Sequence, residues 1–153
     1  SMIEEASFDA VYSSHNIEHV FAHEVPVVLR EFSRVLKPDG FLVITCPDVQ
    51  SLGEALAQGR LLDPLYHSPA GPIAAIDILW GHRASIAVGK VYMANKVGFT
   101  AQALANTLGA SGFGSALCIR QSAAFALWAL ATKDSADQDR LGALRQTYLP
   151  HHA

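Results

Sequence analysis

The stretch VLREFSRVLKPDGFLVITCPD, residues 28–48, decides the fold, because one periodic pattern gives way to another within it. With the residues just before it, its first part forms an apolar stripe at three- and four-residue steps, carried by Val25, Val28 or Leu29, Phe32, Val35 and Leu36. This spacing predicts a helix over residues 24–37, with Pro26 in its first turn and Pro38 and Gly40 ending it. The continuous apolar run at 41–47 predicts a strand covered on both faces of a parallel sheet.

Alternating apolar residues in SFDAVYSS predict another strand over residues 9–14. Strand, helix and strand within about 40 residues make one right-handed crossover unit. Further along, capping-box spacing at Ser51–Glu54 predicts a short helix, and Thr100 is expected to cap a second helix that runs through Leu108. Two strand-like runs follow, joined by a turn around Ser122, and these predict an antiparallel pair over 113–121 and 124–132.

The segment at residues 49–98 is expected to be an insertion within the single domain 1–153. From residue 60 onward it carries several prolines and glycines, and no period of two or 3.6 persists. A connection of that length is more often a lid or a binding segment than spare chain. Residues 134–153 are expected to form a polar tail with one weak helix around Leu141–Leu144.

Composition excludes several classes of partner. The 153 residues are 16% charged and carry a net charge of −3, without the basic run that binding to nucleic acid requires. No apolar run reaches the roughly 20 residues that span a bilayer, and we see no leader sequence. Cys46 and Cys118 both lie in apolar segments and are interpreted as buried thiols. We therefore expect a cytoplasmic protein that binds neither nucleic acid nor membranes.

One short motif suggests a metal site. His15, Glu18 and His19 have the spacing H-x-x-E-H, which in some hydrolases holds zinc together with a general base. That use requires both imidazoles on one continuous helix and a third ligand later in the chain. His15 instead follows a predicted strand directly, and the next helix begins only around residue 24. We keep a zinc hydrolase as a remote alternative and assign no metal ligand.

Three segments carry a family resemblance: SFDAVYSSHNIEHV, VLREFSRVLKPDGFLVITCPD and NKVGFTAQALANTLGASGF. In this order they resemble the C-terminal half of class I S-adenosylmethionine-dependent methyltransferases of the type 11 kind, over roughly residues 7–132. The resemblance implies an α/β fold, a partial Rossmann-like methyltransferase sheet with flanking helices. Residues 9–14, 41–47, 124–132 and 113–121 would be its fourth, fifth, seventh and sixth strands, adjacent in that order, with the first three strands missing.

The resemblance also implies S-adenosylmethionine as the cofactor. In the family, a glycine-rich turn after the first strand and an acidic residue after the second hold the adenosine part. No G-x-G-x-G follows any predicted strand here, and the glycines at 108–115 lie between a helix and a strand. We therefore expect this chain to lack the cofactor loop and to be inactive by itself.

Candidate site residues follow partly from the resemblance. In the family, the residues just after the fourth strand lie along the methionine part of the cofactor, which implies a cofactor role for Ser14, His15, Asn16 and His19. Substrate candidates are Glu18 and residues of the middle segment, namely Tyr66, His67, Trp80 and His82, with Asp77 and Arg83 beside them. The catalytic residue is unknown, although His15, His19 or His82 could accept a proton.

Structural roles stay open for several of these residues. Glu18 and His19 could simply cap a turn, Asp48 is more typical of a cap, and Tyr66 and Trp80 could only anchor the middle segment.

Two functions remain open. The chain is either part of a methyltransferase acting on an unidentified small-molecule acceptor or a non-catalytic, methyltransferase-derived interaction module. Without the first three strands, the strand at 9–14 would present an unpaired apolar edge. We expect that edge to mediate a homodimer.

Overall fold

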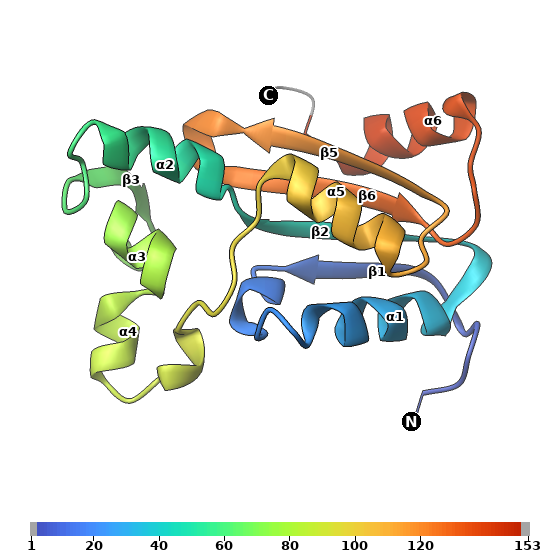
Figure 1. The fold of residues 1–153 in the computed structure, drawn as a ribbon, viewed down its shortest axis with the longest axis horizontal. Helices are drawn as coiled ribbons and strands as arrows, with labels where there is room; N and C mark the ends of the chain where they lie inside the picture. Colours follow the sequence, from blue (N-terminus) through green and yellow to red (C-terminus); the bar gives the residue numbers. More distant parts are fainter. Residues whose placement is uncertain (1–2, 151–153) are drawn as a thin grey trace.

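The computed structural model describes residues 3–150, which are built around one four-stranded sheet (Figure 1). Its strands are β1 (Phe8–Ser14), β2 (Leu36–Pro47), β5 (Ser115–Gln121) and β6 (Ala126–Thr132). They lie in the order β1-β2-β6-β5, with β1 parallel to β2 and β6 antiparallel to both of its neighbours. The order of these strands is the one expected from the sequence.

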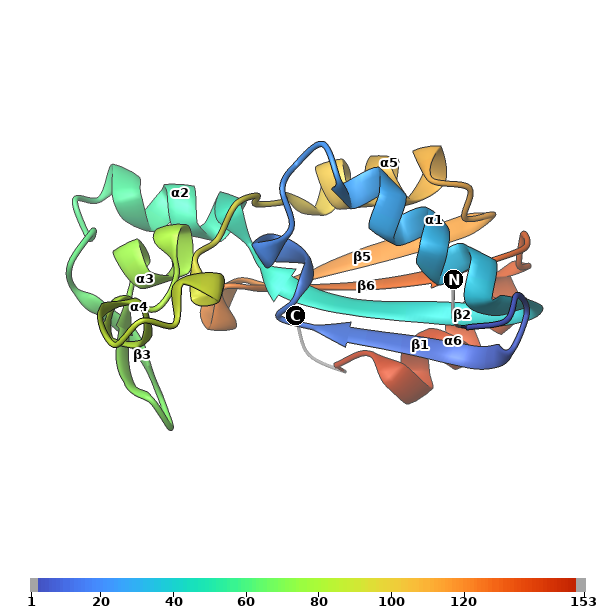
Figure 2. The ribbon, with the colours of Figure 1, turned by 90° about the horizontal axis from the view of Figure 1, so that it is seen from below.

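Helices cover both faces of this sheet. One face carries α1 (Val25–Val35) and α5 (Ala101–Ala110), and the other carries α6 (Gln138–Tyr148), as Figure 2 shows. The hydroxyl of Thr100 accepts a hydrogen bond from the Ala103 N–H and so caps α5, as the sequence predicted. The C-terminal region is more ordered than a polar tail, because Leu144 and Leu149 pack against the sheet. Residues 151–153 of that region lie outside the described part.

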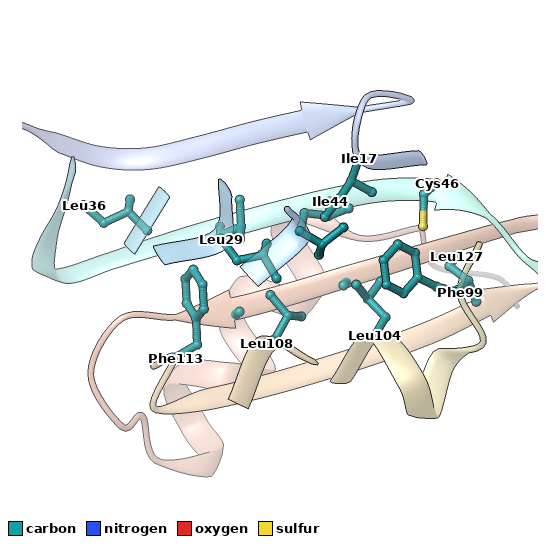
Figure 3. Close-up of a cluster of buried hydrophobic side chains, with 14 residues drawn as sticks. Ile17, Leu29, Leu36, Ile44, Cys46, Phe99, Leu104, Leu108, Phe113 and Leu127 are labelled. Carbon is teal, nitrogen blue, oxygen red and sulfur yellow. The ribbon is translucent and has the colours of Figure 1, made fainter. Parts of the chain in front are cut away.

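Side chains of β2 point alternately to the two faces of the sheet and contribute to the hydrophobic cluster on each face. Leu42, Ile44 and Cys46 are buried against α1 and α5, in the cluster drawn in Figure 3. Val43, between them in sequence, joins Leu130 in the cluster under α6. Successive side chains of a strand point to opposite faces, so one apolar run is buried on both sides.

The first part of β2 was not expected to be strand. Leu36 pairs with Phe8, but the next pair is Ala10 with Phe41, so residues 37–40 form an irregularity in the ladder. Pro38 and Gly40 therefore do more than end α1, since they lie in a bulged extension of the strand. α1 itself ends at Val35, two residues earlier than predicted.

The insertion lies at the end of the sheet where β1 and β2 terminate (Figure 2). It contains α2 (Val49–Ala57), β3 (Pro64–Ser68), β4 (Gly71–Ala74), α3 (Ala75–Trp80) and α4 (Arg83–Ala87). β3 and β4 form a separate antiparallel hairpin. Elements this short escape periodicity analysis, because four to six residues cannot display a helical or strand repeat.

The predicted cap of α2 was wrong. The helix begins at Val49, and the Asp48 carboxylate caps it by accepting from the Gln50 N–H at 3.0 Å. Ser51 lies inside the helix and donates its hydroxyl to the same carboxylate at 2.6 Å. Within residues 3–150, no helix is both long and apolar enough to cross a membrane.

Replacing Leu29 with Ala tests the core on which α1 packs. Leu29 is fully buried, so its truncation should lower the free energy of unfolding by about 2–5 kcal/mol. Val27→Ala on the same helix is the matched control, because Val27 is 58% exposed, and it should change that free energy by about 0.5 kcal/mol or less. Urea unfolding followed by circular dichroism measures both. Equal losses would contradict the assigned face of α1.

Candidate functional site

A cavity of about 860 Å³ opens at the carboxyl ends of β1 and β2, between the sheet and the insertion. Four segments supply its walls. The end of β1 and the turn after it contribute Ser14, His15, Glu18 and His19; the end of β2 contributes Thr45 and Pro47; the insertion contributes Tyr66, Ile73, Asp77, Ile78, Gly81, His82, Tyr92, Met93 and Asn95; and the β5–β6 hairpin contributes Gln121, Phe125 and Trp128. Ligands bind α/β folds at this edge, because the loops following the parallel strands converge there.

His15 and Glu18 form a hydrogen-bonded pair at the end of β1. The backbone of His15 has a φ of +46°, and its N–H still donates to the Thr45 carbonyl at 2.9 Å. Its Nδ1 lies 3.2 Å from Glu18 Oε1, and this hydrogen bond raises the pKa of His15. A histidine held in the left-handed region beside a buried carboxylate is typical of a constrained functional turn.

Glu18 is the more unusual member of that pair. Its side chain is 4% exposed, and its second oxygen, Oε2, is buried with no hydrogen-bond partner among residues 3–150. A buried acceptor left unsatisfied costs about 1–3 kcal/mol or more. A donor from outside the chain, such as water or a ligand, would satisfy it.

His19 is fixed from a distant part of the chain. Its Nδ1 lies 3.1 Å from the carbonyl oxygen of Ala94, and Lys96 and Val97 donate their N–H groups to the Glu18 carbonyl at 2.7 and 3.3 Å. Residues 94–97 thus tie the end of the insertion to the turn after β1. We call this segment the strap.

Asp77 organises the insertion and does not act as a free acid. It accepts hydrogen bonds from the backbone N–H groups of Ala74 and Arg83 at 3.0 and 3.1 Å, and it pairs with the Arg83 guanidinium at 2.8 Å. The Arg83 hydrogen bond is the main cause of a pKa of about 2. His82 beside it places Nδ1 2.8 Å from the Ser85 hydroxyl.

Asp48 also has a structural role. It is fully buried, caps α2, and forms an ion pair with Arg120 on β5 at 2.7 Å. Burial opposes its ionisation, yet hydrogen bonds from Ser51, Arg120 and the Gln50 N–H keep its pKa below the usual value. This network joins the insertion to the sheet.

The structure brings together some sequence-predicted site residues and not others. The cavity is lined by Ser14, His15, Glu18, His19, Tyr66 and His82. Three candidates lie elsewhere: Asn16 precedes the 3-10 turn Ile17–His19, His67 is exposed on the β3–β4 hairpin, and Trp80 borders a smaller hollow of about 230 Å³. At 61% exposure, Trp80 does not anchor the insertion to the core either.

Sequence reasoning missed the wall formed by Gln121, Phe125 and Trp128. The signal was present in the predicted strand order. β5 runs in the same direction as β2, so the β5–β6 connection must return to the edge where β1 and β2 end.

The H-x-x-E-H spacing is not realised on one helix. His15 precedes a short 3-10 turn, Ile17–His19, and the Nδ1 atoms of both imidazoles are engaged by Glu18 and Ala94. In the described chain, no cluster of three or more His, Cys, Asp or Glu is placed to hold a metal ion. These contacts argue against the zinc-hydrolase alternative.

Comparison with known proteins identifies a family segment. Residues 2–44 match the family model described as "Methyltransferase domain". This segment includes β1, the His15–His19 turn and α1. A comparison of the sequence with curated proteins gives no significant match.

Solved structures share the fold. The CMeT domain of the citrinin polyketide synthase is 14% identical with a TM-score of 0.52, covering 86% of this chain and 29% of that one. A possible exported protein from Bordetella parapertussis is 18% identical with a TM-score of 0.54, covering 88% and 42%. A methyltransferase from Thermotoga maritima, described as SAM-dependent and a possible histamine N-methyltransferase, is 16% identical with a TM-score of 0.50, covering 86% and 58%. The chain thus spans 29–58% of the length of these structures.

Replacing Asp77 with Asn tests the electrostatic role of the Asp77–Arg83 pair. The folded-state pKa of Asp77 is lowered from 3.8 to about 2, so ionised Asp77 contributes stability above about pH 4 that is lost as the pH falls towards 2. The variant should lose about 2 kcal/mol in the free energy of unfolding near pH 6, and the difference from the native chain should shrink in acid.

Urea unfolding at about pH 6, 4 and 2.5 measures this dependence. Asp63→Asn, at an exposed aspartate of the same insertion, is the control and should stay within about 0.5 kcal/mol. A deficit in Asp77→Asn that is the same at every pH would show that the loss comes from packing and not from charge.

Proposed function

We propose that this chain is part of a class I S-adenosylmethionine-dependent methyltransferase, which its matched segment and its fold support, and that it forms the acceptor-binding side of an enzyme that methylates a small molecule. The observation that carries this proposal is the cavity of about 860 Å³ at the carboxyl edge of the sheet. Its volume is typical of small-molecule sites, and its walls mix aromatic side chains with a few polar groups.

The residues present fit one end of the cofactor. Ser14, Glu18 and the histidines at the end of β1 offer hydrogen-bond acceptors, and Glu18 Oε2 lacks a donor, which suits the ammonium group of the methionine part. With β1 and β2 assigned to the fourth and fifth strands, Asp48 after β2 does not take the place of the ribose-binding acid, which in the family follows the second strand. The fit therefore extends to the methionine end and not to the adenosine end.

The chemistry divides between the cofactor and the chain. When bound, S-adenosylmethionine supplies a methyl group on a sulfonium centre whose bonding electrons remain on sulfur after transfer. The chain's residues would orient the acceptor and exclude water from it. The insertion 49–98 is suited to that task as a substrate-binding lid, because the strap ties it over the end of β1.

We further propose that the adenosine-binding strands of the fold lie outside this sequence. Two observations support this. β1, which we assign to the fourth strand of the family, is at the edge of the described sheet, and the chain spans 29–58% of the structures it matches. On this view the chain by itself binds the cofactor weakly and is inactive.

A second candidate function is a non-catalytic interaction module. The edge strand β1 favours it, because Phe8 and Tyr12 are 44% and 63% exposed and β1 pairs only with β2 in the described sheet. We propose that this edge joins two copies of the isolated chain as a homodimer.

The free thiols Cys46 and Cys118, whose pKa values are raised by burial, suit a reducing cytoplasm as the location of the protein.

Titration with S-adenosylhomocysteine tests the cofactor proposal. We expect weak binding, with a dissociation constant on the order of 1 mM, because only the methionine end is recognised. Backbone NMR signals at Ser14, His15 and Glu18 should shift. Glu18→Gln should weaken binding about threefold or more by removing the carboxylate, whereas Glu24→Gln, at an exposed position before α1, should not change it.

Two outcomes of this titration would contradict the proposal. Micromolar binding by this chain would show that the adenosine-binding machinery is present. An absence of NMR shifts at the end of β1 under saturating ligand would show that the methionine part of the cofactor does not bind there.

Sedimentation tests the homodimer. At a concentration of about 0.1 mM, the native chain should sediment as a dimer, and Phe8→Lys should sediment as a monomer because a charge at the strand edge opposes pairing. Val88→Lys is the matched control, since Val88 is 74% exposed on the far side of the insertion, and it should stay dimeric. A native monomer, or equal dissociation of both variants, would rule out the edge as the interface.

A further inference from the structure

One wall of the cavity has a fixed hydrogen-bonding polarity. A carbonyl oxygen can only accept a hydrogen bond, so the contact between Ala94 O and His19 Nδ1 requires the proton to be on Nδ1. In the neutral ring, Nε2 then carries the lone pair. Nε2 makes no hydrogen bond within the described residues, and His19 is one of the residues that line the cavity. The wall at His19 therefore presents an acceptor.

The strap holds this arrangement in place. Asn95 donates its side-chain amide to the Ile78 carbonyl at 2.7 Å and its backbone N–H to the Trp80 carbonyl at 3.2 Å. Ala94 also forms a bridge with Gly81, whose φ is +100°. A Cβ on Gly81 would lie 2.1 Å from the Met93 carbonyl oxygen, so only glycine allows the strap this close. Gly81 is thus a positioning residue for His19.

The charge and shape of the cavity restrict which ligands can bind against this wall. No Lys or Arg lines the cavity among residues 3–150, and the Glu18 carboxylate stands beside His19. An anionic ligand would meet no ammonium or guanidinium group there, and the His15 imidazole is already paired with the Glu18 carboxylate. The remaining lining includes five aromatic side chains, which favour a flat ring: Tyr12, Tyr66, Tyr92, Phe125 and Trp128.

We propose that the methyl acceptor is an uncharged or cationic aromatic molecule bearing a hydroxyl or amine nucleophile, and that His19 Nε2 accepts the proton of that nucleophile. The inference rests on the proposed function and specifies its substrate class. The nucleophile would pass its proton to Nε2 as it gains the methyl group, while the carbon–sulfur bond of the cofactor would break with its electron pair left on sulfur. The imidazolium would then release the proton to solvent. His19 is the catalytic base in this scheme, and the Ala94 carbonyl fixes its tautomer.

Matched aromatic probes test the acceptor class on the full chain. 2-Naphthol carries a donor, 2-methoxynaphthalene has a similar shape without one, and 2-naphthoate carries a negative charge. We expect 2-naphthol to bind about 2- to 12-fold more tightly than its methyl ether, the range that one hydrogen bond supplies, and 2-naphthoate to bind most weakly. Dissociation constants follow from NMR titration.

Substitutions test whether His19 causes the preference for 2-naphthol over its methyl ether. His19→Phe keeps an aromatic ring without the acceptor, so this variant should bind 2-naphthol and 2-methoxynaphthalene about equally. His23→Phe is the matched control, because His23 is exposed, stacks on Phe21 and does not line the cavity; it should keep the preference. Gly81→Ala should weaken the preference by displacing the strap, whereas Gly53→Ala, whose Cβ meets nothing within 4 Å, should not.

A measurement on the native chain does not depend on any variant folding. Long-range ¹H–¹⁵N spectra should show the His19 proton on Nδ1, and its Nε2 resonance should move with 2-naphthol but not with the methyl ether. Equal affinities, a preference that survives His19→Phe, tightest binding of 2-naphthoate, or no binding of any probe would overturn the inference. If 2-naphthol is preferred while S-adenosylhomocysteine fails to bind, the subsite at His19 that binds a hydroxyl group is supported and the methyltransferase function is contradicted.

Discussion

The burial of β2 on both faces is the constraint on which the rest of the structure depends. Leu42, Ile44 and Cys46 face α1 and α5, while Val43 faces α6. A strand in this position has to pair on both edges and be covered on both sides, which sets the order of the sheet and the two helical layers. The loops at its carboxyl end therefore gather on one side of the molecule, and the cavity lies there.

Between the sheet and the insertion, polar contacts add fixed points to the apolar packing of Phe125 against the cluster of Leu52, Ile73, Ala75 and Ile78. The Asp48–Arg120 pair joins the start of the insertion to β5, and the strap joins its end to the turn after β1. Buried or half-buried polar groups of this kind specify one arrangement, because any displacement would leave them unsatisfied. The insertion is thus held at both of its ends, and the cavity has defined walls.

The turn after β1 combines features that are individually uncommon. His15 has a left-handed backbone, Glu18 is buried with one oxygen unsatisfied, and His19 is oriented by a carbonyl 75 residues away in sequence. A left-handed backbone at a non-glycine residue and an unsatisfied buried oxygen are each costly in isolation. Their convergence at the ligand-binding edge of an α/β sheet is the strongest physical argument that this turn is functional.

Long apolar runs such as 41–47 and the stripe through Leu29 report burial directly, so the sequence by itself determined the strands of the sheet and the helices that cover one face. The strand order followed from the family resemblance. The sequence also located the turn from Ser14 to His19, through position after a strand and family resemblance. Only the tertiary structure decided which distant groups meet that turn. Ala94 is 75 residues from His19 and Asp48 is 72 residues from Arg120, and elements as short as β4 leave no periodic signal. Local patterns record how a segment is buried, whereas the contacts that shape a cavity depend on how separate segments pack together.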